Sequence, residues 1–145
     1  MPSGIWQAKV LAAVLLTPIA ATAETWLAEA EILNALAGKT IEGRYASGLA
    51  FIERYLPDGR IEYFESGRSI GGHWSVTSGT LCTIYDLDSA GGCFRVTRVG
   101  ANCFEFYFAA RSEAAAPGPE GSEQRWTARG SVSGEKSACQ DGANV

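Results

Sequence analysis

From Ile41 onward, apolar and polar residues alternate along short segments that are rich in aromatic and β-branched side chains. A period of two residues is typical of strands with one buried face. The runs are TIEGRY, LAFIERYL, RIEYFE, SIGGHWSV, TLCTIYD, CFRVTRV, CFEFYFAA and QRWTARG, separated by breaks such as ASG, PDG, SG and GAN that favour turns. The pattern predicts an all-β fold: an antiparallel, up-and-down, lipocalin-like barrel of about eight strands within about residues 40–130.

A different pattern precedes the strands. The apolar residues that recur at helical spacing in ETWLAEAEILNALAGKT are Trp26, Ala30, Leu33, Leu36 and Ala37. Gly38 suits the position that follows the end of a helix. We therefore expect one amphipathic helix over about residues 25–37, lying across one end of the barrel.

The first 23 residues resemble an export signal rather than part of the fold. One positive charge, Lys9, precedes the apolar run VLAAVLLTPIA, and the small residues ATA follow it. This order is typical of a secretory signal peptide, and the run is shorter than the roughly 20 residues of a transmembrane helix. A buried core helix is the alternative, and Pro18 argues against it. We expect cleavage after Ala23, no membrane span after cleavage, and a periplasmic or secreted location in a bacterium.

Length and charge limit the class of protein. The chain has 145 residues, so removal of residues 1–23 leaves one domain, residues 24–145, whose tail is residues 131–145. The net charge is −4, and nucleic acid requires a basic surface, so we expect no nucleic-acid partner.

Four cysteines, Cys82, Cys93, Cys103 and Cys139, all follow the export signal. An even number of cysteines in an exported chain predicts structural disulfides. The sequence has no C-x-x-C motif, and His73 is its one histidine. It therefore offers neither a usual zinc set nor a thioredoxin-type redox pair, and we expect no metal and no cofactor.

The turns set the strand registers. LPDGR suits a bulged three-residue loop with Gly59 at a positive φ, and this loop pairs Tyr55 with Ile61. The same register places Glu53 opposite Tyr63. Two-residue and three-residue loops at SG and GAN align the later hairpins in the same way. Because directly opposed residues share a face, one face collects Phe51, Tyr55, Ile61, Tyr63, Trp74, Val76, Leu81, Phe94, Val96, Phe104, Phe106 and Phe108.

These registers also suggest how the cysteines pair. If Leu81 opposes Phe94 on the inner face, then Cys82 opposes Cys93 on the outer face, within about 4.5–5.5 Å at Cβ. Cys103 is then left for Cys139. Three connectivities are formally open, and we favour Cys82–Cys93 with Cys103–Cys139.

The run from Leu36 to Phe108 resembles the DUF995-like families, a group of small exported bacterial proteins of unknown function. The pieces that carry this resemblance are LAGKTIEG, YLPDGRI, GGHWSV, GTLC and CFRVTRVG. The resemblance implies a lipocalin-like periplasmic barrel. It implies no activity and assigns no functional residue.

Most of the candidate chemistry has a simpler structural explanation. By alternation with Trp74, His73 faces outward, as a surface histidine does. Asp86 and Asp88 lie in a glycine-rich loop that lacks the further carboxylates of a calcium site. Glu53 differs, because the register places its charge on the aromatic inner face, where a carboxylate is costly without a partner. A register slip of one residue would place it outside.

We interpret the chain as a non-enzymatic binding module for a small apolar or amphipathic ligand. The ligand-binding residues would be Glu53, Tyr55, Tyr63 and Trp74, which we expect to line one cavity near a barrel mouth. The first alternative is a binder or inhibitor of another cell-envelope protein that acts through its loops. A weaker alternative is an enzyme with Glu53 as its base. An open cavity would favour the small-ligand binding module. A filled barrel with an exposed apolar loop patch would favour the binder of an envelope protein. An acid with a perturbed pKa in a cleft would favour the enzyme.

Overall fold

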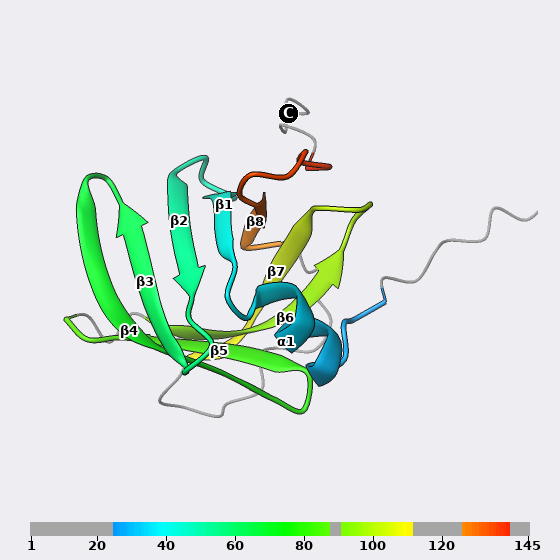
Figure 1. The fold of residues 1–145 in the computed structure, drawn as a ribbon, viewed down its shortest axis with the longest axis horizontal. Coiled ribbons are helices and arrows are strands. Elements are labelled where there is room, and N and C mark those ends of the chain that lie inside the picture. Colours follow the sequence, from blue (N-terminus) through cyan, green and yellow to red (C-terminus); the bar gives the residue numbers. More distant parts are fainter. Residues whose placement is uncertain (1–24, 88–90, 112–125, 140–145) are drawn as a thin grey trace, which may run out of the picture.

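Eight strands form a closed antiparallel barrel in which each strand pairs with its neighbour in the sequence and β8 pairs with β1 (Figure 1). The computed structural model describes residues 25–87, 91–111 and 126–139. The strands are β1 (Thr40–Tyr45), β2 (Ala50–Tyr55), β3 (Arg60–Glu65), β4 (Arg68–Thr77), β5 (Thr80–Tyr85), β6 (Gly92–Arg98), β7 (Phe104–Arg111) and β8 (Ala128–Val132). The predicted all-β, up-and-down barrel is confirmed.

The turn chemistry produces the expected registers. Ser78 and Gly79 both have positive φ, as a tight two-residue hairpin turn requires. Gly59 has a φ of 87° and its neighbouring strands pair Glu53 with Tyr63. The structure also contains an irregularity that the sequence did not suggest. Between Cys93 and Phe94, the register of β6 against β7 shifts.

The last strand lies further along the chain than predicted. The strand expected over residues 124–130 is β8, which begins at Ala128 and ends at Val132. Val132 pairs with Ile41, so two residues assigned to the tail belong to the barrel. Their periodicity is weak, and β1 holds them by backbone pairing, which depends little on side chains.

The helix α1 (Glu29–Leu36) is shorter than the predicted span of residues 25–37. Trp26 instead forms a bridge with Thr97, and the Leu27 amide donates to the Val96 carbonyl at 2.8 Å. This pairing with β6 keeps the first residues extended. The Glu31 carboxylate accepts a hydrogen bond from the Ala28 amide and so satisfies a donor at the start of the helix.

The buried face of α1 also differs from the expected one. Ile32 and Leu36 are fully buried, whereas Leu33 is 38% exposed. The predicted face included Trp26 and Leu33, and it was wrong because Trp26 lies outside the helix. Leu36 is the predicted position that the barrel does bury.

α1 lies across one end of the barrel (Figure 1). Ile32 and Leu36 pack into the same core as the inward residues of the strands. The Glu29 carboxylate accepts a hydrogen bond from the Ser78 amide at 2.7 Å, which fixes the helix to the β4–β5 turn. The Gly38 amide donates to the Tyr55 carbonyl at 2.7 Å. The helix therefore closes this end of the barrel.

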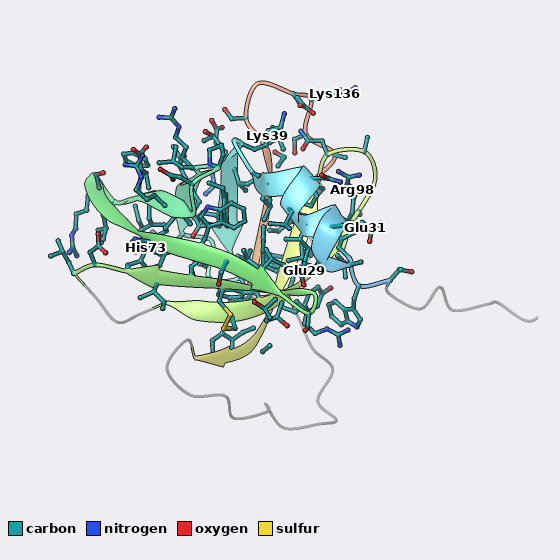
Figure 2. All side chains as sticks on the ribbon, turned by 60° about the horizontal axis from the view of Figure 1, so that its bottom comes forward. Glu29, Glu31, Lys39, His73, Arg98 and Lys136 are labelled. Carbon is teal, nitrogen blue, oxygen red and sulfur yellow. A yellow bond between two sulfur atoms is a disulfide. The ribbon has the colours of Figure 1, made fainter. Side chains whose placement is uncertain are left out.

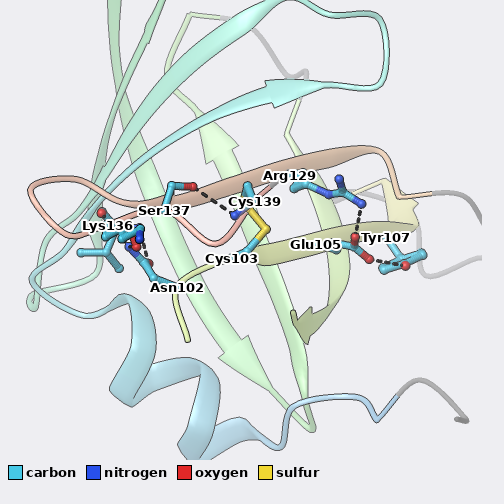
Figure 3. Close-up of a disulfide and its surroundings, with 9 residues drawn as sticks. Asn102, Cys103, Glu105, Tyr107, Arg129, Lys136, Ser137 and Cys139 are labelled. Atoms are coloured by element: carbon cyan, nitrogen blue, oxygen red, sulfur yellow. Dashed lines mark hydrogen bonds and ion pairs between the residues drawn. A yellow bond between two sulfur atoms is a disulfide. The ribbon is translucent and has the colours of Figure 1, made fainter. Parts of the chain in front are cut away.

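Both predicted disulfides are present, and they pair all four cysteines. Cys82 and Cys93 face each other across β5 and β6, with their Cα atoms 4.0 Å apart. Cys103 joins Cys139 with a Cα separation of 4.9 Å (Figure 3). Asn102 reinforces this connection, because its side chain bonds to the backbone of Val132 and Lys136. The second disulfide thus holds the described part of the tail against the outside of the barrel.

The predicted signal peptide, residues 1–23, lies outside the described residues. In the part of the chain that the structure describes, no helix is long and apolar enough to cross a membrane.

Candidate functional site

The barrel contains a cavity of about 230 Å³. It lies toward the ends of the strands that are remote from α1, because its wall includes the last residues of β1 and β5 and the first residues of β6 and β8. Half of the fourteen lining residues are aromatic. The wall consists of Tyr45, Phe51, Glu53, Tyr55, Leu81, Thr83, Tyr85, Gly91, Gly92, Phe94, Phe106, Phe108, Thr127 and Ala128.

Glu53 lines this cavity, and among the described residues of the wall it is the one with a charged side chain. The alternation of β2 turns Glu53 inward together with its neighbours Phe51 and Tyr55, and Glu53 is 8% exposed. The Tyr55 hydroxyl donates to Glu53 Oε2, and the Tyr85 hydroxyl donates to Oε1. Two phenols therefore hold one carboxyl group in a fixed orientation.

Burial controls the protonation of this group. Loss of hydration raises the pKa of Glu53, and the hydrogen bonds from Tyr55 and Tyr85 oppose part of that rise. Burial and the nearby negative charge of Glu53 raise the pKa of Tyr45, Tyr55 and Tyr85. The phenols therefore stay neutral around physiological pH and act as donors.

Two of the four predicted ligand-binding residues line this cavity and two do not. Glu53 and Tyr55 belong to the wall, whereas Tyr63 and Trp74 are absent from it. All four are buried, at 8%, 1%, 8% and 7% exposure in chain order, as the predicted inward face requires. The expectation that they share one cavity is therefore corrected, although their inward orientation was predicted correctly.

The side chains of Tyr63 and Trp74 are occupied elsewhere in the core. Trp74 packs edge-on against Tyr55, with ring centroids 5.3 Å apart, and donates its indole N–H to the Leu56 carbonyl at 2.9 Å. The Tyr63 hydroxyl lies 2.8 Å from that of Tyr45 and also donates to Glu65. Strand alternation determines the face on which a residue lies, but it does not determine its depth along the barrel axis.

Tyr85, Tyr45 and Thr83 are wall residues that the sequence analysis did not identify. Tyr85 could have been predicted from the sequence. The register that pairs Trp74 with Thr83 also pairs Gly72 with Tyr85, so Tyr85 lies on the same inner face. Tyr45 lies at the end of β1, where its amide donates to the Leu49 carbonyl at 2.9 Å across a short turn. Alternation along β1 places it on the same face as Ile41.

Most of the predicted inner face is buried as expected. The exceptions lie near the ends of the barrel: Val76 and Phe94 are half-buried and Phe108 is 48% exposed. Phe94 and Phe108 still face the cavity, where their rings meet edge-on with centroids 5.8 Å apart.

His73 lies on the outside of β4, as predicted, with its side chain 72% exposed (Figure 2). Its Nδ1 atom is 4.0 Å from Asp86 Oδ1. Asp88 lies outside the described residues. Among the residues that are described, no three His, Cys, Asp or Glu side chains are grouped in a way that could hold a metal ion.

A second buried carboxylate, Glu105, lies on the outer face of β7 and has a structural environment. It accepts hydrogen bonds from the Tyr107 hydroxyl at 2.7 Å and from Arg129 (Figure 3). Trp26 covers Tyr107 edge-on, with ring centroids 5.1 Å apart. Glu105 thus has a cationic partner, Arg129, and an aromatic cover, whereas the partners of the cavity carboxylate among the described residues are phenols.

A scan of family models and searches of curated proteins and of solved structures found no match to this chain.

Proposed function

We propose that this protein is a non-enzymatic binding module for a small, mostly apolar ligand that carries one polar group. The observation that supports it is the aromatic cavity with a single carboxyl group, Glu53, in its described wall. An apolar pocket with few, fixed polar groups is the usual form of a small-molecule site. An engineered apolar cavity of about 150 Å³ binds benzene, so a cavity of about 230 Å³ has room for a somewhat larger molecule.

Two features support fixed recognition at this site. Tyr55 and Tyr85 orient Glu53 before any ligand enters, so little side-chain entropy is lost on binding. α1 closes the far end of the barrel with Ile32 and Leu36, so the ligand would meet a packed floor there.

A carboxylate-dependent reaction at Glu53 is the second candidate. It is favoured by the raised pKa of Glu53, since acids and bases in active sites often have shifted pKa values. We rank it lower because both oxygens of Glu53 already accept hydrogen bonds and the described wall presents no second charged group. Turnover of a bound ligand that is lost in Glu53→Gln would move it to first place.

We propose a bacterial periplasmic location for the mature protein, after cleavage of the predicted signal peptide. Two disulfides in one small domain are typical of proteins that fold in an oxidising compartment. The resemblance of the run from Leu36 to Phe108 to the DUF995-like exported proteins agrees with this location. Membership of that group is part of the same proposal.

The cavity is tested with propylbenzene, an apolar probe of suitable size, by ligand-observed NMR on the disulfide-bonded protein. Ala128 lies in the wall at 5% exposure, so Ala128→Leu should fill part of the cavity and weaken binding. Ala37→Leu adds the same bulk at an exposed position and should leave binding unchanged. Thermal unfolding would show that both variants fold. If propylbenzene failed to bind, or bound Ala128→Leu as tightly as the unmodified protein, binding through the loops would become the leading hypothesis.

A further inference from the structure

We propose that the ligand of this cavity is a small organic cation, a protonated amine on an apolar skeleton. This inference rests on the proposed function, because it assigns a chemical class to the ligand of the same site.

The charge balance around Glu53 favours a cationic ligand. The described wall contains no lysine, arginine or histidine. Arg54, the neighbour in the chain, lies on the outer face, where its guanidinium pairs with Glu62 at 3.5 Å. The buried carboxylate therefore lacks a cationic partner among the described wall residues, and the cation would come from the ligand. The other buried carboxylate, Glu105, differs from Glu53, because Arg129 of the same chain forms an ion pair with it.

The Glu53 carboxylate can accept further hydrogen bonds from a ligand. Each oxygen of an ionised carboxylate accepts more than one hydrogen bond. Tyr55 uses one position on Oε2 and Tyr85 uses one position on Oε1. An ammonium group has three donors and no acceptor, so it complements the positions that remain. A ligand carboxylate would instead place a like charge beside Glu53 in a dry site, which is unfavourable.

The rest of the cavity wall also favours an organic cation. Seven aromatic rings line the cavity: Tyr45, Phe51, Tyr55, Tyr85, Phe94, Phe106 and Phe108. The faces of such rings are negative and attract organic cations, by about 0.5–2 kcal/mol for each well-placed ring. The same rings provide apolar surface for the ligand skeleton. The carboxylate and the aromatic rings therefore both favour a positively charged ligand.

The volume of the cavity limits the ligand to small amines. Scaled from the cavity of about 150 Å³ that binds benzene, a cavity of about 230 Å³ holds about nine non-hydrogen atoms. Phenethylamine is a cation of this size. 2-Phenylethanol is its neutral counterpart, and phenylacetate is a similar anion.

The test measures the affinities of these three compounds for the disulfide-bonded protein at about pH 8 by isothermal titration calorimetry. We expect phenethylamine to bind about 10- to 100-fold more tightly than 2-phenylethanol, since hydrogen bonds to charged groups are the stronger ones. Phenylacetate should bind most weakly. Glu53→Gln should remove the preference for the cation, measured as the ratio of the affinities for phenethylamine and 2-phenylethanol. Glu62→Gln makes the same change of charge on the outer face and should retain the preference.

The pH dependence on the unmodified protein provides a test that needs no variant at Glu53. Protonation of Glu53 competes with the cation, so the affinity for phenethylamine should fall as pH is lowered, and that for 2-phenylethanol should stay constant. The ionisable groups around Glu53 are the phenols of Tyr45, Tyr55 and Tyr85, whose pKa values are raised, and beyond them Tyr63 with Glu65. Glu65→Gln should therefore leave the pH dependence in place.

The outcomes separate the two proposals. If 2-phenylethanol binds as tightly as phenethylamine, or if Glu53→Gln keeps the preference for the cation, the ligand is not a cation but the cavity still binds small molecules. If neither these compounds nor propylbenzene bind at millimolar concentration, both proposals are overturned.

Discussion

Glu53 shows how one strand residue changes the character of a barrel interior. Its neighbours on the inner face of β2, Phe51 and Tyr55, are core residues, and alternation places the carboxyl group between them. Burying a carboxyl group costs free energy, and two phenols offset part of that cost by donating to it. An apolar residue at this position would avoid the cost. The binding role proposed above would give this costly group a use.

The raised pKa of Glu53 predicts how stability depends on pH. In the folded state, Glu53 keeps its proton to a higher pH than in the unfolded state. Between the ordinary and the raised pKa the folded protein binds more protons, so the contribution of Glu53 to stability is present at low pH and is lost as pH rises. Glu53→Gln should lack this dependence, so its free energy of unfolding should improve relative to the unmodified protein as pH rises above the ordinary glutamate pKa of about 4.

Urea unfolding over this pH range measures the difference. Glu62→Gln, on the outer face, serves as the control and should follow the unmodified protein at each pH. A difference between the Glu53→Gln variant and the unmodified protein that stays constant with pH would show that burial does not perturb this carboxyl group.

At the scale of elements, α1 acts as the closure of one barrel end. Its contribution comes from Ile32 and Leu36, which have no exposed surface, whereas Leu33 is partly exposed. Truncating a fully buried large side chain leaves a cavity. Ile32→Ala and Leu36→Ala should each lower the free energy of unfolding by about 2–5 kcal/mol.

Leu33→Ala is the matched change on the same helix, and it should cost clearly less because water already reaches Leu33. Denaturant unfolding of the three variants gives the ranking. Equal losses at Leu33 and Leu36 would mean that the buried face of the helix is the one that the sequence pattern alone suggested.

The elements also show which parts of the fold the sequence determines locally. The hairpin registers follow from turns such as Ser78–Gly79, because a short loop leaves the two strands one way to pair. The registers in turn placed Cys82 opposite Cys93 and Glu53 on the inner face. The start of α1 was not predictable in this way, since the bridge of Trp26 to Thr97 joins residues that are far apart in the chain.

The candidate site was predicted less completely than the hairpin registers, because it also depends on contacts between residues far apart in the chain. Its faces come from alternation, which is local, so Glu53 and Tyr55 were identified. The depth of a side chain along the barrel axis depends on how all eight strands tilt around the axis, which no hairpin specifies. Trp74 therefore lies on the expected face but packs against Tyr55 and does not line the cavity.

At the scale of the whole molecule, two disulfides constrain different lengths of chain. Cys82–Cys93 spans a sequence separation of 11 residues and Cys103–Cys139 one of 36. On the chain-entropy model, their loss should cost about 3 and about 4 kcal/mol respectively. Double Cys→Ala variants of each pair, compared by denaturant unfolding, should rank in this order. A larger loss for the Cys82–Cys93 pair would show that local geometry outweighs loop length.

Export is a second prediction for the molecule as a whole. The apolar run and the ATA sequence predict a mature protein that begins at Glu24. The intact mass of the protein recovered from the periplasm of its natural host measures this directly. A periplasmic species that still begins at Met1 would contradict the prediction.

The bonds that Tyr55 and Tyr85 make to Glu53 also have a mechanical consequence. β2 and β5 are not neighbours in the sheet, so the bond from Tyr85 spans the lumen. The ladder of backbone bonds fixes the circumference of a closed ring, but a ring of fixed circumference still flattens into an oval without breaking any of them. A hydrogen bond between β2 and β5, across the lumen, resists that flattening. Glu53 therefore helps to maintain the cross-section of the barrel, and a ligand that displaced Tyr85 from this carboxylate would remove that restraint.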